Sequence, residues 1–387
     1  LEDTVMTIRY GIIGSGMMGR EHIANIALLD GATVTAICEP DDQQRQLSVH
    51  AAEHPEPGFV EDRVQSGVAH EVKGFASLDD YLAAGDSYDV HLIASPNDTH
   101  REILERVFTD GKPVLCEKPV CTTVAHTREV IELAGKRANS VWVAMEYRYM
   151  PPVQALIDAV QEGVTGAPRM MAIREHRFPF LEKIGDWNRF STRTGGTLVE
   201  KCCHYWDLMR LVLQADPVRV FASAAMDSNH LDERYGGKTP DIIDNAYVIV
   251  DFDNGARGML DLCMFAEGSH WQEQLAVTGP KARVEAFIPG PARFDPDGRP
   301  HEAKLVVSDR TTKRETERPI PVDTTLLLAG DHHGSTFYQH KAFCELVRKQ
   351  AKGKKAKPKV SLDDGLWSVR VGEAAERSAR VGESVRL

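Results

Sequence analysis

The chain has 387 residues, a formal net charge of −11 and seven cysteines. A chain of this length usually folds as two domains, because single hydrophobic cores stop growing at about 250–300 residues. The acidic charge disfavours nucleic acid and anionic membrane surfaces as partners. The sequence shows neither an apolar run long enough to span a bilayer nor a signal-peptide pattern, so we expect a cytoplasmic protein that binds small molecules. The cysteines are irregularly spaced and lack a C-x-x-C pair, which favours reduced thiols and predicts no metal site.

Residues 6–149 alternate apolar runs with amphipathic segments. This alternation is typical of a doubly wound parallel sheet and predicts an α/β Rossmann domain. The expected strands are Ile8–Ile13, Thr33–Cys38, Tyr88–Ala94, Pro113–Cys116 and Val141–Met145.

The first of these runs leads into the segment Gly14-Ser15-Gly16-Met17-Met18-Gly19, and an acidic residue, Glu39, closes the second run. The spacing matches the dinucleotide-binding fingerprint, in which glycines allow a tight turn and close approach of the backbone to a pyrophosphate. The phosphates are expected at the following helix N-terminus. Glu39 can accept hydrogen bonds from a ribose 2′-hydroxyl, whereas a 2′-phosphate would meet its charge and those of Asp41 and Asp42, so we predict NAD rather than NADP.

Polar residues follow three of the later strands, at the edge of the sheet where such folds bind ligands. They are Ser95, Pro96, Asn97 and His100 after the third run, Glu117 and Lys118 after the fourth, and Glu146, Tyr147 and Arg148 after the fifth. Lys118 is followed by a proline, so its ammonium is expected on a short, stiff connection near the nicotinamide.

The pattern changes after Met150, which precedes two prolines and so disfavours a continuing helix. Residues 150–387 are expected to form an α+β domain around a large open mixed or antiparallel sheet. Its expected strands are Arg169–Phe178, Val218–Met226, Ala246–Phe252, Arg257–Phe265 and Gln274–Thr278. The broad face of such a sheet could bury itself against another subunit, so we expect a homodimer or homotetramer.

A glycine pair, Gly195-Gly196, opens a segment that we expect to be one helix reaching Asp207. Helical periodicity then places Glu200, His204 and Asp207 on one face. A carboxylate one turn from a histidine can orient the imidazole and raise its basicity.

Basic and aromatic residues crowd the stretch before this glycine pair, in a chain that is acidic overall. Guanidinium groups suit the recognition of carboxylate, sulfonate or phosphate, so an anionic sugar is one candidate ligand. The alternative is that arginines in 169–178 face solvent or a neighbouring subunit. The predicted substrate-binding set is Tyr147, Arg148, Arg174, His176, Arg177, Trp187, Arg193 and His333, the last from a polar loop, Asp331-His332-His333-Gly334, to which we assign hydrogen bonding rather than metal binding.

Together these motifs resemble the Gfo/Idh/MocA family of NAD(P)-dependent sugar and polyol oxidoreductases, over essentially the whole chain. The likeness rests on Gly14–Gly19, on Pro96-Asn97 through His100, on Glu117-Lys118-Pro119 and on Gly195–Asp207. The resemblance implies that Lys118 is the catalytic lysine and His204 the catalytic histidine. Glu200 stands where most members carry aspartate, which moves its carboxylate by one methylene.

The resemblance and the residues lead to a mechanism in which His204 takes the proton of a substrate hydroxyl, Lys118 stabilises the developing charge and Glu200 positions the substrate or imidazole. The predicted activity is hydride transfer between a secondary hydroxyl of a sugar, inositol or related polyol and NAD. Two alternatives stay open: a glycosidase that oxidises, eliminates and reduces its substrate on NAD, and a non-catalytic dinucleotide sensor that regulates a partner.

Overall fold

The computed structural model describes residues 6–55, 71–137, 140–291, 294–295, 297–298 and 301–387. The chain divides into two compact units. The first runs to Glu146 and also contains Asp323–Leu366, and the second consists of Tyr147–Val322 and Trp367–Leu387. The sequence-based boundary after residue 149 lies three residues from this division, but the structure groups residues 323–366 with the first unit rather than the second.

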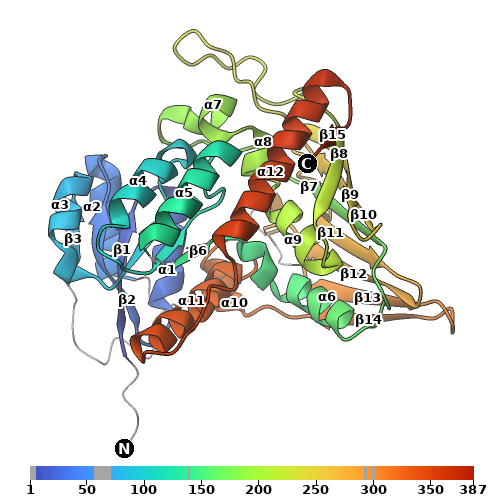
Figure 1. The fold of residues 1–387 in the computed structure, drawn as a ribbon, viewed down its shortest axis with the longest axis horizontal. Coiled ribbons are helices and arrows are strands. Elements are labelled where there is room, and N and C mark those ends of the chain that lie inside the picture. The colour runs from blue at the N-terminus through green and yellow to red at the C-terminus, as the bar shows by residue number, and fades with distance from the viewer. Residues whose placement is uncertain (1–5, 56–70, 138–139, 292–293, 296, 299–300) are drawn as a thin grey trace, which may run out of the picture. The chain divides into compact units, whose positions relative to one another are not determined.

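The first unit is built on a six-stranded sheet in the order β3-β2-β1-β4-β5-β6, with every strand parallel to its neighbours (Figure 1). The strand order reverses between β1 and β4, which is the switch point where doubly wound sheets bind ligands. The strands are β1 (Ile8–Ile13), β2 (Ala32–Cys38), β3 (Lys73–Phe75), β4 (Val90–Ile93), β5 (Val114–Cys116) and β6 (Val141–Val143). The predicted parallel α/β fold is confirmed.

Helices alternate with these strands, as the amphipathic segments predicted. Each expected strand run is a strand, although the structure trims the third, fourth and fifth runs at their ends. The helices are α1 (Met17–Ala27), α2 (Asp42–Glu53), α3 (Leu78–Ala83), α4 (His100–Val107) and α5 (Val124–Arg137), and the short 3-10 turns η2 (Gly85–Ser87) and η3 (Asn97–Thr99) join them.

Residues 323–366 belong to the first unit because their helix α11 (Ser335–Ala351) supplies part of its core. The Phe343 ring lies 6.1 Å from the rings of both Tyr10 on β1 and Trp142 on β6, between ring centroids. All three side chains are buried. Burial of large aromatic side chains is a major source of stability, so the returning segment is integral to this unit. The short helix α10 (Thr324–Leu328) precedes it.

The second unit is built on a nine-stranded mixed sheet in the order β14-β13-β12-β11-β7-β10-β9-β8-β15. Only the β7–β10 pair is parallel among its pairings. The strands are β7 (Met170–His176), β8 (Pro217–Ala225), β9 (Asn245–Phe252), β10 (Arg257–Cys263), β11 (Trp271–Thr278), β12 (Ala282–Pro289), β13 (Ala303–Asp309), β14 (Glu315–Ile320) and β15 (Val385–Arg386). The predicted α+β unit with an open mixed sheet is confirmed.

One face of this sheet packs against helices α6 (Pro151–Gln161) and α9 (Cys203–Leu213), where the hydrophobic core of the unit lies. The helix α12 (Leu362–Val381) contributes Val371 and Ala375 to the same core. The opposite face keeps large apolar side chains exposed, among them Phe221, Ile249 and Met259, which stand side by side on β8, β9 and β10. An apolar row on an uncovered sheet face is unusual for a monomer.

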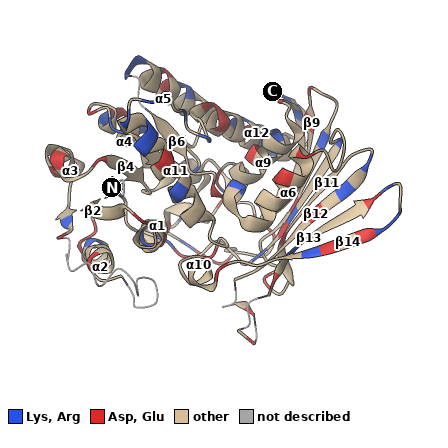
Figure 2. Ribbon diagram, turned by 90° about the horizontal axis from the view of Figure 1, so that it is seen from below, with Lys and Arg blue, Asp and Glu red and all other residues tan. Residues whose placement is uncertain are grey.

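Four strands of this sheet, the short β15 and the consecutive β12, β13 and β14, were not among the expected strands. Figure 2 shows charged residues along β12, β13 and β14, and on β14 five of the six residues are exposed. An edge strand exposed in this way lacks the apolar alternation from which strands are recognised. Among the described residues, none of the helices is both long and apolar enough to cross a membrane.

Candidate active site

The glycine segment forms a tight loop between β1 and α1 in the first unit. Gly14 has a φ of +85°, and a Cβ placed there would lie 2.5 Å from the Cα of Ser95. A Cβ at Gly19 would lie 2.6 Å from the carbonyl oxygen of Gly14. No side chain caps the N-terminus of α1, where Gly16 is the first flanking residue. Free amides at a helix start, reached by a side-chain-free loop, fit the pyrophosphate of a dinucleotide.

Glu39, at the end of β2, is held against this loop. One carboxylate oxygen accepts a hydrogen bond from the amide of Ser15 at 2.8 Å, and the other accepts one from the amide of Asp41 at 3.1 Å. Arg45 donates to the carbonyl oxygen of Glu39 at 2.7 Å and pairs with Asp42. The carboxylate therefore has a fixed place beside the loop, as a residue that reads a ribose requires.

The segments that follow β4 and β5 are braced by His100. Its ring nitrogens lie 2.9 Å from the carbonyl oxygen of Pro119 and 3.0 Å from that of Ser95. Burial lowers the pKa of this imidazole more than the two carbonyl oxygens raise it. His100 thus lies between the Ser95–Asn97 turn and the Glu117–Pro119 turn and positions both.

Glu117 links Lys118 to the interior of the first unit. One carboxylate oxygen accepts a hydrogen bond from the amide of Lys118 at 3.1 Å, and the other lies 3.0 Å from Nε2 of His22. The Nδ1 of His22 lies 2.9 Å from Nε2 of His340. Burial acts to lower the pKa of His22, but the hydrogen bond and charge of Glu117 outweigh it and raise that pKa. The lysine backbone is therefore fixed by a buried polar chain.

In the second unit, the single helix expected over 195–207 is wrong. The structure has two helices, α8 (Thr197–Glu200) and α9, separated by a turn at Lys201 and Cys202. The amide of Cys202 bonds to the carbonyl of Thr197, one residue further back than a regular helix allows, and the next helix restarts from the Cys202 carbonyl. Glu200 and His204 are both buried, but on different helices.

The Asp207 carboxylate binds Arg148. The Nε of Arg148 donates to Asp207 at 2.6 Å, and a second nitrogen of the guanidinium contacts the other oxygen, so the pair is bidentate. Both side chains are buried. Arg148, predicted as a substrate ligand, therefore fastens the 3-10 turn η4 (Glu146–Tyr149) to α9.

Tyr147, the neighbour of Arg148, lies against His204. The two rings are parallel within 7° and their centroids are 4.0 Å apart. The Tyr147 hydroxyl accepts a hydrogen bond from Nζ of Lys201 at 2.6 Å, and Lys201 pairs with Glu175 at 2.8 Å. Stacking fixes the plane of the imidazole, and the ion pair fixes the ring that stacks on it.

Lys201, Glu175 and Glu273 form a buried charged cluster that the motifs did not reveal. Glu175 and Glu273 face one another on neighbouring strands, and Arg177 lies 3.3 Å from Glu175. Burial, and then the charge of Glu175, raise the pKa of Glu273 to about 7. One signal in the sequence could have found this cluster, since strand alternation in 170–176 puts the charged Glu175 on the face of Met171 and Ile173.

The other predicted substrate residues come from several different elements. Arg174 and His176 alternate with Glu175 and so lie on the uncovered sheet face, where His176 contacts Asp261 at 3.1 Å. Arg177 stacks on Phe178. Trp187 is buried, and the ammonium of Lys183 lies over its ring. Arg193 is half-buried on α7 (Ser191–Thr194). His333 belongs to the first unit, where burial lowers its pKa to about 4.

A doubly wound sheet that carries this glycine loop and a fixed acidic residue defines a dinucleotide-binding protein, and the fold suits an oxidoreductase. Comparison with known proteins agrees. The chain belongs to the Gfo/Idh/MocA oxidoreductase family: residues 8–145 match its NAD-binding Rossmann fold and residues 157–387 match its C-terminal alpha/beta domain. The protein is an NAD-binding dehydrogenase of this family.

Individual relatives resemble the chain over nearly its full length. The myo-inositol 2-dehydrogenase of Thermotoga maritima is 26% identical over 381 residues, which is 98% of each chain. A myo-inositol dehydrogenase structure from Corynebacterium glutamicum is 22% identical, covers 99% of both chains and has a TM-score of 0.73. An oxidoreductase from Agrobacterium radiobacter, solved with NAD+, L-tartaric acid and magnesium, is 16% identical, covers 98% of both and also has a TM-score of 0.73. The two solved structures show a shared fold.

Proposed function

We propose that this protein oxidises a secondary hydroxyl of inositol, a related polyol or a sugar with NAD. The observation that carries the proposal is His204, a buried imidazole held parallel to Tyr147, on a chain of the Gfo/Idh/MocA family. The substrate class is supported by the inositol dehydrogenases among its relatives. An anionic sugar is the finer alternative, for which Arg174, Arg177 and Arg193 are the predicted arginines that Asp207 does not engage.

In the proposed reaction His204 takes the proton of the hydroxyl, because imidazole is a base suited to neutral pH. Lys118 donates a hydrogen bond to the same oxygen and stabilises its developing negative charge. Glu200 orients the substrate. Bound NAD supplies the hydride acceptor, held by the Gly14–Gly19 loop.

The preference for NAD over NADP is part of the proposal. Glu39 holds its carboxylate beside the amide of Ser15, and a 2′-phosphate would bring further negative charge there. The nearest arginines are engaged: Arg45 with Glu39 and Asp42, and Arg20 with the carbonyl of Ser15 and the side chain of Gln44.

We also propose a homodimer or homotetramer in the cytoplasm. The apolar row of Phe221, Ile249 and Met259, with the largely exposed Tyr247 beside it, is the surface that supports self-association. Size-exclusion chromatography with light scattering measures the mass. Ile249→Lys is expected to reduce it to that of a monomer.

The test of the activity is a panel of inositols, neutral and anionic sugars and glycosides incubated with NAD. Absorbance of reduced nicotinamide and mass spectrometry of the products are followed together. NADH formation with oxidised polyol supports the proposal. Release of an aglycone without NADH would identify a glycosidase instead, and NAD binding without turnover of any substrate would identify a sensor.

A further inference from the structure

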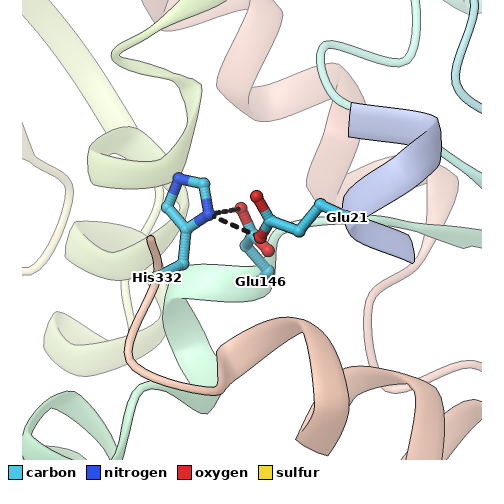
Figure 3. Close-up of side chains that lie close together, drawn as sticks. All are labelled: Glu21, Glu146 and His332. Carbon is cyan, nitrogen blue, oxygen red and sulfur yellow. Dashed lines mark hydrogen bonds and ion pairs between the residues drawn. The ribbon is translucent and has the colours of Figure 1, made fainter. Parts of the chain in front are cut away.

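His332 lies in the polar loop for which hydrogen bonding rather than metal binding was predicted, since no further ligand is evident near it in the sequence. The fold supplies two. Figure 3 shows Glu21 from α1, Glu146 from the turn after β6 and His332 from the segment between α10 and α11 converging within the first unit. One candidate ligand atom from each of the three side chains lies within 4.8 Å of the other two.

From this convergence we infer that Glu21, Glu146 and His332 bind a divalent transition-metal ion such as Zn²⁺, through two carboxylates and one imidazole. This site is independent of the proposed substrate. Imidazole with carboxylate is a donor set that suits Zn²⁺, whereas Mg²⁺ prefers oxygen ligands alone.

The spacing of the atoms suits coordination. The Nδ1 of His332 lies 3.0 Å from Oε1 of Glu21 and 3.5 Å from Oε1 of Glu146. Metal bonds of about 2.1 Å place neighbouring ligand atoms about 3.0–3.4 Å apart. An ion can therefore take the place of the proton on Nδ1 with small side-chain movements, and that proton is released on binding.

The charge around the cluster is the second argument. Glu117 lies 3.0 Å from Nε2 of His22 and also faces Glu146, so three carboxylates share two imidazoles, His22 and His332. Glu117 and Glu146 are buried, and Glu21 is partly buried. Replacing one proton by a dication would add the positive charge that this group of carboxylates lacks.

The surrounding chain holds the three ligands in place. The Thr336 hydroxyl lies 2.6 Å from Glu146 and 3.0 Å from Glu21, as a residue supporting two metal-bound carboxylates would. Gly330 packs on Glu21, since a Cβ there would lie 2.5 Å from its carboxylate oxygen. The His332 side chain is 21% exposed and that of Glu21 is 12% exposed, so an ion can reach the site from solvent.

The test uses the full-length protein, treated with a chelator and dialysed into metal-free buffer. Zn²⁺, Mn²⁺ and Mg²⁺ are titrated separately by isothermal titration calorimetry, with metal content measured by mass spectrometry. We expect one Zn²⁺ per chain, weaker binding of Mn²⁺, no binding of Mg²⁺, and an increase in the melting temperature with Zn²⁺. No stoichiometric Zn²⁺ binding to the wild-type protein would overturn the proposal, leaving an ion pair between His332 and the two glutamates.

Variants locate the ion. Glu146→Gln and His332→Asn are each expected to weaken Zn²⁺ binding at least about tenfold, and Thr336→Val is expected to weaken it by roughly 10- to 100-fold. Glu132→Gln, an exposed change on α5, is the matched control and should bind as the wild type does. Circular dichroism and the melting temperature without metal show whether each variant is folded. Unchanged affinity in the folded ligand variants would place the ion elsewhere and refute the site.

Discussion

Two groups of residues hold their functional side chains by different means. We call the Gly14–Gly19 loop with Glu39, in the first unit, the nucleotide half, and Tyr147, Lys201 and His204, in the second unit, the substrate half. In the nucleotide half the backbone does most of the work: Gly14 and Gly19 bring segments into close contact, and Glu39 is fixed by two amides. In the substrate half, side chains are positioned by other side chains: Lys201 donates a hydrogen bond to Tyr147, and Tyr147 stacks on His204. A site built by backbone geometry can be recognised from a sequence motif, whereas a network of side chains from distant positions gives few such motifs. The comparison predicts that the nucleotide half tolerates loss of a distant charge better than the substrate half does.

The largest expected effect comes from the proposed catalytic groups themselves. Lys118→Ala and His204→Ala are each expected to lower kcat by about 10²- to 10⁴-fold, because each removes a positioned proton donor or acceptor. The affinity for NAD should change little in His204→Ala. Steady-state kinetics and fluorescence titration with NADH measure the two quantities. Lys136→Ala, on the exposed side of α5, is the control, and near-normal turnover in either active-site variant would reject its assigned role.

Next comes the buried ion pair of the substrate half. Lys201→Met leaves the charge of Glu175 buried and is expected to lower the free energy of unfolding by roughly 3 kcal/mol or more. Adding Glu175→Gln should recover much of the loss. Lys304→Met breaks a partly exposed pair with Glu317 on the same sheet and should cost less than about 1 kcal/mol. Urea denaturation measures the free energy of unfolding of all three variants. Equal losses for Lys201→Met and Lys304→Met would contradict the predicted difference between the buried and the exposed ion pair.

Glu273 gives the substrate half a pH dependence. Its pKa is about 7 in the fold against 4.5 ordinarily, so the folded state holds a proton that the unfolded state has lost. This group therefore lowers stability as the pH rises from about 4.5 to 7, by roughly 3 kcal/mol at most, and has no further effect above that range. Glu273→Gln should flatten the fall in melting temperature between pH 5 and pH 8. A curve as steep as that of the wild type, or of the exposed control Glu317→Gln, would contradict the assignment.

A smaller effect is expected in the nucleotide half. Glu39→Ser removes the carboxylate beside Ser15 and should reduce the preference for NAD over NADP by about tenfold, equivalent to about 1.4 kcal/mol. The ratio of kcat/KM values for the two cofactors is the measurement. Glu102→Ser, on the exposed side of α4, should leave the ratio unchanged. A ratio that stays constant in Glu39→Ser would show that other groups select the cofactor.

The smallest effect is expected on the uncovered sheet face. Arg174 and Glu175 are consecutive on β7, so their side chains lie on opposite faces of the sheet. Arg174→Ala should therefore leave kcat/KM within about twofold of the wild type. Arg177→Ala removes a contact of the buried Glu175 and should lower kcat/KM more than Arg174→Ala does. If the Arg174 variant loses more activity than the Arg177 variant, the division of the sheet into two functional faces is wrong.

Much of the fold followed from sequence patterns. The strands of the first unit are buried apolar runs, and the glycine loop and Glu39 are near each other in the chain, so spacing alone predicted their association. The charged edge strand β14 escaped prediction because it lacks an apolar face. The return of α11 escaped it too, because Phe343 meets Tyr10 and Trp142 only in three dimensions.

The candidate site was predicted where motifs carry it and not elsewhere. Periodicity placed Glu200 and His204 on one helix, but a turn at Lys201 separates them, and residue spacing alone does not reveal such a break. Lys201 and Glu175 were missed because a buried ion pair between residues 26 positions apart has no local signature. Glu21, Glu146 and His332 are likewise brought together only by the order of the strands and the path of residues 323–366.

The interleaving of the two units along the chain has a consequence for dissecting the molecule. A fragment that stops at residue 149 follows the boundary expected from the sequence. It would lack α11 and leave Tyr10 and Trp142 exposed to water. A faithful excised dinucleotide module needs residues 6–146 joined by a designed linker to 323–366. During synthesis, too, the sheet that emerges first must wait for about two hundred further residues before its last covering helix is made.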